Sequence, residues 1–380
     1  MDRLRLKKEY RDTVPHRVPH CAAHKLPHPA AHKEPCKAAN EAPVQKRQRL
    51  SAASFMLLIG VLTVVLLLSI VFSVCTGIAG GNIETFAHAI MYPARASGIG
   101  KIMMDMRMPR ALTACITGAA FALSGAAMQG LTRNPLADAG LLGINAGAGF
   151  FVALTAVFLP AAPKIVTIVS AFAGAAFAAT LVYEFGVGKR KTESFRLILA
   201  GAAVSALLTA LSQAVSLAFG ITKAMSFWSA GSLSGVTWQS LHLIAPFIIT
   251  AGGIAMLLSG YLSVLALGED SAAGLGINVR AVRLICIFAV LLLAGASVSL
   301  VGGISFLGLI VPHISRFFVG GDYKRILPIS ALLGGIILVI ADVAARTVNA
   351  PFDTPVGALV SIIGVPVFFA LTYRKGVHTL

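Results

Sequence analysis

Ten long apolar runs, rich in Leu, Val, Ala and Gly, dominate the sequence from Phe55 to Tyr373. A bilayer core is ~30 Å thick, so about 20 apolar residues suffice to cross it as a helix. Only 12% of the residues are charged, against about 25% in soluble domains. We therefore predict an all-α, polytopic membrane protein with about ten transmembrane helices. The predicted spans are residues 55–75, 108–130, 139–160, 165–185, 195–218, 241–265, 281–300, 303–318, 326–346 and 355–373, and the eighth is short.

The first fifty residues differ from the rest of the chain. Residues 1–50 are rich in Lys, Arg, His and Pro and show no apolar periodicity, which is typical of a disordered segment. The first apolar run begins only after this segment, so no signal peptide is expected. We divide the chain into a cytosolic basic tail, residues 1–50, and one transmembrane domain, residues 51–380.

Five histidines of the tail recur every four residues, and such a tract can sequester a transition metal weakly. Prolines such as Pro19 and Pro27 interrupt any helix that would stack the imidazoles on one face. We favour two other interpretations: a solvated basic tail near anionic lipid, or a translation start placed too far upstream. No metal site is assigned. The histidines are His16, His20, His24, His28 and His32.

The formal net charge of +16 is distributed unevenly across the predicted membrane. With the N-terminus inside and alternating spans, 24 of the 31 Lys and Arg residues lie inside and seven lie outside. This asymmetry follows the positive-inside rule and predicts a multi-pass membrane protein with both termini cytoplasmic. A nucleic-acid binder would need a basic soluble domain, whereas the tail is short and lacks interleaved aromatic residues. The expected surroundings are membrane lipid, and no nucleic acid.

Signatures of catalysis are absent from the sequence. We find no phosphate-binding Gly-x-x-x-x-Gly-Lys-Ser/Thr loop, no His-Glu-x-x-His and no Gly-x-Ser-x-Gly. Ion-driven transporters usually bury charged side chains near the bilayer midplane, but candidates here, such as Asp342 and His313, lie towards the span ends. We therefore expect a transporter subunit that depends on another subunit for energy. An ion-gradient-driven secondary transporter remains the alternative.

Two polar segments are candidates for contacts with partners. Arg107-Met-Pro-Arg110 opens a long apolar helix, and two arginines three residues apart at the membrane surface suggest docking of an acidic partner. The loop from Leu265 to Ile277 is helix-prone around Glu269–Ala273 and is stopped by glycines. Such a helix can lie across a partner's surface, or it can be an ordinary polar connector.

The order of motifs resembles the permease subunits of type II ABC importers for ferric siderophores, haem and cobalamin, the FecCD/vitamin-B12 permease family. The resemblance covers roughly residues 55–375. The motifs are Arg107-Met-Pro-Arg110, Gly125-Ala-Ala-Met-Gln129, Arg133-Asn-Pro-Leu-Ala137, Leu267-Gly-Glu269, the run from Gly303 to Arg316, Ala341-Asp-Val-Ala-Ala-Arg346, and Pro355-Val-Gly357. Three places depart from the family pattern: Asp138-Ala139-Gly140 lacks a common proline, Asp353-Thr-Pro355 replaces Glu-x-Pro, and Ser361 stands where threonine is frequent.

The resemblance implies a set of partners. A second permease subunit, identical or paralogous, would complete a central path, and a cytosolic ABC ATPase dimer would use ATP and Mg²⁺. No cofactor would be bound by this chain. An extracytoplasmic substrate-binding protein would deliver the cargo, for which a ferric siderophore is expected and haem or cobalamin are alternatives.

The resemblance also implies residue roles. Arg107, Arg110 and Arg346 would face glutamates of the binding protein, because arginine forks bind carboxylates bidentately. The ATPase would contact the loop at Gly268, Glu269, Ala273, Leu275 and Gly276. The fifth and tenth helices would line the path, and the fifth offers only small, weakly polar side chains there: Ser205, Thr209, Ser212 and Ser216.

Overall fold

The computed structural model describes residues 51–77, 80–92, 98–186 and 193–376. The predicted tail with its five histidines lies outside the described residues. Within the described ranges the chain forms helices and no strand, so the predicted all-α class is confirmed.

Ten apolar helices occupy the ten predicted runs. Seven are long and apolar enough to cross a membrane by length and composition. The other three are shorter apolar helices, Ile144–Phe158, Leu307–Val319 and Val356–Phe369. The ten are α1 (Ala52–Cys75), α4 (Met108–Thr132), α5 (Ile144–Phe158), α6 (Lys164–Gly186), α7 (Glu193–Ala218), α9 (Trp238–Leu265), α11 (Val279–Val301), α12 (Leu307–Val319), α13 (Tyr323–Thr347) and α14 (Val356–Gly376).

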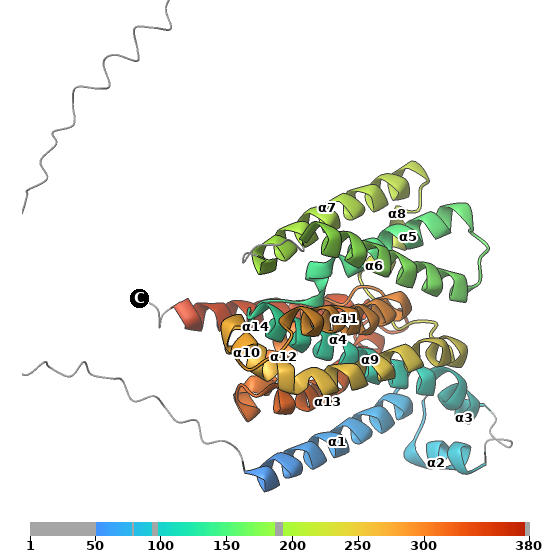
Figure 1. Ribbon diagram of the computed structural model, residues 1–380. Coiled ribbons are helices and arrows are strands. Elements are labelled where there is room, and N and C mark those ends of the chain that lie inside the picture. Colours follow the sequence, from blue (N-terminus) through green and yellow to red (C-terminus); the bar gives the residue numbers. More distant parts are fainter. Residues whose placement is uncertain (1–50, 78–79, 93–97, 187–192, 377–380) are drawn as a thin grey trace, which may run out of the picture. The chain divides into compact units, whose positions relative to one another are not determined.

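Short elements lie at the two ends of the helical bundle (Figure 1). One end carries α10 (Glu269–Gly274) and is called the α10 end. The opposite end carries the predicted docking arginines and is called the arginine end; here the chain forms α2 (Ile83–Met91), α3 (Ile99–Ile102), the π-helical turn η2 (Met103–Arg107) and α8 (Thr222–Ser229). A 3₁₀ turn, η3 (Ala139–Leu142), follows α4. None of the predicted spans covers residues 76–107, where α2, α3 and η2 form.

Helix α4 is the most enclosed helix of the bundle. Helix α4 belongs to the continuous helical span Ile99–Thr132. In the most apolar part of this span 78% of the residues are buried, whereas the corresponding part of α1 is 6% buried. Its glycines allow direct backbone contact: a Cβ on Gly125 would lie against the carbonyl of Gly308 in α12, and one on Gly118 against the carbonyl of Gly334 in α13. In lipid, such close approach replaces hydrophobic burial as the main source of helix association.

The short α12 is preceded by a non-helical segment, Gly302–Phe306. This segment is packed inside the protein: Val301 accepts a hydrogen bond from Ser232 N at 2.8 Å, and a Cβ on Gly302 would lie against the carbonyl of Trp228. The Gln129 amide of α4 donates to the carbonyls of Gly308 and Leu309, both at 3.3 Å. Irregular backbone at membrane depth is tolerated only when protein encloses it in this way.

Candidate functional site

Five charged side chains meet at the arginine end and form what we call the arginine cluster: Arg107, Arg110, Asp342, Arg346 and Asp353. Arg110 of α4 donates from Nε to Asp342 Oδ1 at 2.8 Å and from Nη1 to Asp353 Oδ2 at 3.1 Å. Arg346 Nε lies 3.2 Å from the other oxygen of Asp342, one turn away on α13. Asp342 is therefore shared by two guanidinium groups, and its side chain is 0% exposed.

Two of these arginines also cap the C-terminus of α1. Arg107 donates to the carbonyl of Val74 at 3.2 Å. Arg346 donates to the Ser73 carbonyl at 3.1 Å and to its hydroxyl at 2.8 Å. The last carbonyls of a helix lack partners within the helix and carry a partial negative charge, so cations stabilise them. These contacts tie α1 to η2, which directly precedes α4, and to α13.

The three predicted docking arginines are thus brought together, but in a more enclosed setting than the sequence suggested. The side chains of Arg110 and Arg346 are 13% and 11% exposed, and Arg107 is 8% exposed. Sequence reasoning missed the role of Asp353, whose side chain is 31% exposed and covers Arg110. Burial alone would raise the pKa of Asp353, but its hydrogen bond to Arg110 and the charge of that group hold the pKa below its ordinary value.

At the α10 end, the predicted ATPase-contact residues lie in and around one short helix. Gly268 caps the N-terminus of α10 with φ 135°, and Gly276 follows the helix with φ 78°, conformations that favour glycine. Glu269 Oε1 accepts from Arg283 Nη2 of α11 at 2.8 Å and lies 3.4 Å from Arg133 Nη2 after α4. Glu269 therefore holds α10 against two spans, while the apolar side chains of Leu267 and Leu275 are exposed.

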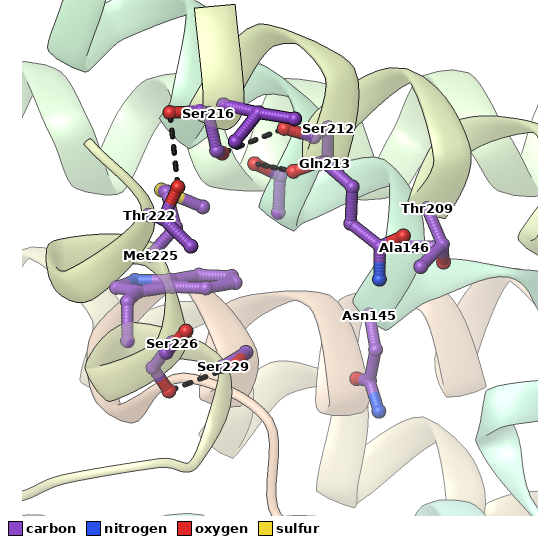
Figure 2. Close-up of a pocket in the computed structure, with 13 residues that line it drawn as sticks. Asn145, Ala146, Thr209, Ser212, Gln213, Ser216, Thr222, Met225, Ser226 and Ser229 are labelled. Atoms are coloured by element: carbon purple, nitrogen blue, oxygen red, sulfur yellow. Dashed lines mark hydrogen bonds between the residues drawn. The ribbon is translucent and has the colours of Figure 1, made fainter. Parts of the chain in front are cut away.

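A pocket of about 390 Å³ lies between α5, α7 and α8 (Figure 2). Three of the four predicted path residues, Thr209, Ser212 and Ser216, line it. Ser205 does not line it and packs near Gly143 instead. The other ten lining residues are Asn145, Ala146, Gly149, Gln213, Leu217, Thr222, Met225, Ser226, Trp228 and Ser229. The sequence analysis did not single out Gln213. It could have indicated a polar site here, because it is the one carboxamide in the apolar run of α7.

Four hydroxyl groups of this pocket donate to backbone carbonyls. The distances are 2.6 Å for Ser216 to Ser212, 3.2 Å for Thr222 to Ser216, 2.9 Å for Ser229 to Ser226, and 3.4 Å for Ser212 to Gly149. Because each of these hydroxyl protons is donated to a carbonyl, the hydroxyl oxygens remain available mainly as acceptors. Among the residues that the structure describes, no group of three or more His, Cys, Asp or Glu is arranged to hold a metal ion.

Comparison with known proteins connects these features to a family. The profile of the FecCD transport family matches residues 65–374. The chain is 42% identical over 308 residues to the iron(3+)-hydroxamate import system permease protein FhuB of Bacillus subtilis (strain 168), covering 80% of this chain and 79% of that protein. It is also 42% identical over 275 residues to the Fe(3+)-citrate import system permease protein YfmD of the same organism, covering 72% and 82%.

A solved structure shows the same architecture. An inward-facing conformation of a metal-chelate type ABC transporter matches with a TM-score of 0.74 and 28% identity, covering 84% of this chain and 99% of that one. The helices described above are therefore arranged as in that transporter.

Proposed function

Because this chain belongs to the FecCD transport family, we propose that it is the membrane-spanning permease of an ATP-driven ABC importer that moves a ferric chelate. The observation that carries the proposal is the family match across residues 65–374, which includes all ten apolar helices except the start of α1 and the last two residues of α14. The name of FhuB describes import of iron(3+)-hydroxamate, and the name of YfmD describes import of Fe(3+)-citrate. A ferric siderophore is the preferred cargo, and haem remains an alternative.

The α10 end is proposed to receive a cytosolic ATPase dimer. Glu269 anchors α10 to α4 and α11, so a push on α10 would be transmitted to two spans at once. The residues proposed to contact or position this partner are Gly268, Glu269, Ala273, Leu275 and Gly276. ATP and Mg²⁺ belong to that partner in this scheme, and the chain itself carries out no hydrolysis.

The arginine end is proposed to dock an extracytoplasmic binding protein. Arg110 is already paired with Asp353 at 3.1 Å, so an incoming glutamate would exchange with Asp353 rather than meet a free arginine. Bidentate guanidinium–carboxylate geometry suits such an exchange. Arg107 and Arg346 would assist mainly by holding α1 in place, since their donors are engaged by its carbonyls.

A second permease subunit is proposed to cover the exposed apolar faces of α7 and α14. Leu199, Leu207 and Leu211 on α7, and Ile362 and Ile363 on α14, are all exposed in this chain alone. In this proposal both termini are cytoplasmic and the protein is multi-pass in the bacterial cell membrane.

The test is uptake of ⁵⁵Fe-labelled chelates in a strain that lacks this gene, with and without the restored chain. Reconstitution in liposomes separates the importer from the secondary transporter. Uptake is expected only when the ATPase, the binding protein and ATP are all present. Vectorial uptake by the purified chain alone, driven by an ion gradient, would overturn the proposal.

A further inference from the structure

We propose that the pocket between α5, α7 and α8 is a cargo-contact site that selects neutral, oxygen-rich ferric chelates, with Asn145 and Gln213 as its specificity-determining side chains. The inference rests on the proposed importer function and adds the chemical class of the cargo. It also changes the expectation from the sequence that the path offers little binding chemistry.

The first step is the hydrogen-bonding capacity that remains unused in the pocket. Asn145, Thr209, Gln213 and Ser226 make no side-chain hydrogen bond to any residue that the structure describes. In Figure 2 the Gln213 side chain extends from α7 towards Asn145 of α5. Each carboxamide offers two N–H donors and one acceptor oxygen. Thr209, Gln213 and Ser226 are exposed and Asn145 is half-buried in this chain, so these groups are open to a ligand that enters the pocket, and their donors suit one rich in oxygen acceptors.

The second step is the absence of charge. None of the thirteen lining side chains is ionisable. An anionic ligand that left water for this pocket would lose hydration without gaining a counter-charge, which is costly. A ferric trihydroxamate avoids that cost, because three singly charged hydroxamates neutralise Fe³⁺ and leave six oxygens as acceptors. A ferric tris-catecholate carries three negative charges and is disfavoured.

The third step is the apolar part of the wall. Trp228 packs on Gly149, where a Cβ would lie 3.3 Å from Cζ3 of the indole ring. Trp228, Met225 and Leu217 together provide a surface for the methylene groups of a chelator arm. A volume of about 390 Å³ is near the lower end of the ~300–1,000 Å³ of small-molecule pockets. The pocket therefore fits one arm of a bulky chelate with its hydroxamate, and the rest would face the central path.

A direct binding test uses the fluorescence of Trp228. The chain has two tryptophans, and Trp238 at the arginine end donates to Met104 O outside the pocket. In a Trp238→Phe background, the purified full chain is titrated with ferric tris(acetohydroxamate), a neutral probe, and with ferric tris(catecholate). We expect saturable quenching by the neutral probe. Adding Gln213→Leu and Asn145→Leu should weaken its apparent affinity about tenfold, the effect of losing two modest hydrogen bonds.

A transport test addresses selectivity in the complete importer. Gln213→Lys places a cation in the pocket and should raise uptake of the anionic chelate relative to the neutral one. The control Thr180→Val removes an exposed hydroxyl of α6 that bonds only to its own helix, and it should leave the ratio unchanged. Wild-type affinities and uptake ratios in all pocket variants would overturn the pocket proposal alone. If the wild-type complex takes up no ferric chelate when ATP is supplied, the proposed importer function itself is wrong.

Discussion

The arginine end and the α10 end both hold a carboxylate between two arginines, but the two sites differ in burial. At the arginine end Asp342 is 0% exposed between Arg110 and Arg346. At the α10 end Glu269 is 39% exposed between Arg283 and Arg133. Breaking a buried pair by removing one partner leaves an uncompensated charge and costs about 3–5 kcal/mol, whereas exposed pairs are worth about 0–1 kcal/mol. The first site is therefore expected to hold its helices together more strongly than the second.

The largest effect is expected from Asp342→Ala. This change leaves Arg110 and Arg346 without their shared carboxylate, so the free energy of unfolding should fall by about 3–5 kcal/mol. Thermal unfolding of the detergent-solubilised chain, followed by intrinsic fluorescence, measures the loss. A variant as stable as the wild type would show that the arginine end does not fasten the bundle.

A smaller loss is expected from Arg107→Leu, which removes the donor to the last turn of α1. Hydrogen bonds to charged groups contribute about 1.5–3 kcal/mol, and the unfolding midpoint should fall accordingly. The control is Lys101→Gln, an exposed change in α3 that should stay within about 0.5 kcal/mol of the wild type. Equal effects of the two changes would contradict a capping role for Arg107.

Glu269→Gln should separate stability from transport. We expect a stability change of about 1 kcal/mol or less, because the ion pairs at α10 are partly exposed. ATP-driven uptake should nevertheless fall severalfold, since the amide holds α10 less firmly against α4 and α11. The measurement pairs unfolding midpoints with uptake rates in liposomes. A stability loss as large as that of Asp342→Ala would erase the contrast between the two ends.

The smallest effect on stability is expected from Asp353→Asn, and it depends on pH. The pKa of Asp353 is lower in the folded chain than its ordinary value of about 3.9. The stabilisation by its ionised form is therefore fully present above about pH 4 and is lost as the pH falls through the folded-state pKa. Unfolding midpoints of wild type and Asp353→Asn should converge on acidification from pH 6 to pH 3. A difference between the two midpoints that did not change on acidification would mean that the ionised form of Asp353 contributes no stability.

The same variant sharpens the docking proposal. Asp353→Asn frees one edge of Arg110, so a binding protein that supplies its own glutamate should bind several times more tightly at neutral pH. The double variant Arg107→Glu, Arg110→Glu is a less specific test of docking. It would also place new carboxylates near Asp342 and destabilise the fold. Loss of uptake in that double variant is informative only if the protein still accumulates in the membrane.

The periodicity and charge of the sequence predicted the number, order and approximate bounds of the ten apolar helices, because each depends on local composition. The partners of the functional side chains were not predictable in this way. Arg110 pairs with Asp342 and Asp353, which lie 232 and 243 residues further along the chain. Nothing in a local pattern distinguishes such a buried pair from arginines that face solvent, and this is why the enclosure of the arginine cluster was missed.

The pocket illustrates a second limit. The family resemblance pointed to the fifth helix, with Ser205, Thr209, Ser212 and Ser216, but the four-residue spacing also lets Ser216 donate to the backbone of its own helix at Ser212. Two of the four side chains with unused donors, Asn145 and Ser226, lie on two other helices. Only the packing of α5 and α8 on α7 brings them to the same cavity.

The backbone contact between Gly125 and Gly308 has a consequence for how such a chain can diverge. No side chain, not even a methyl group, fits between α4 and α12 at this crossing. Substitutions of either glycine should therefore not be tolerated. By contrast, α1 presents most of its surface outward, and many apolar residues are interchangeable along it. Sequences that diverge from this chain should therefore differ mainly at outward-facing positions such as those of α1, while Gly125 and Gly308 both stay glycine.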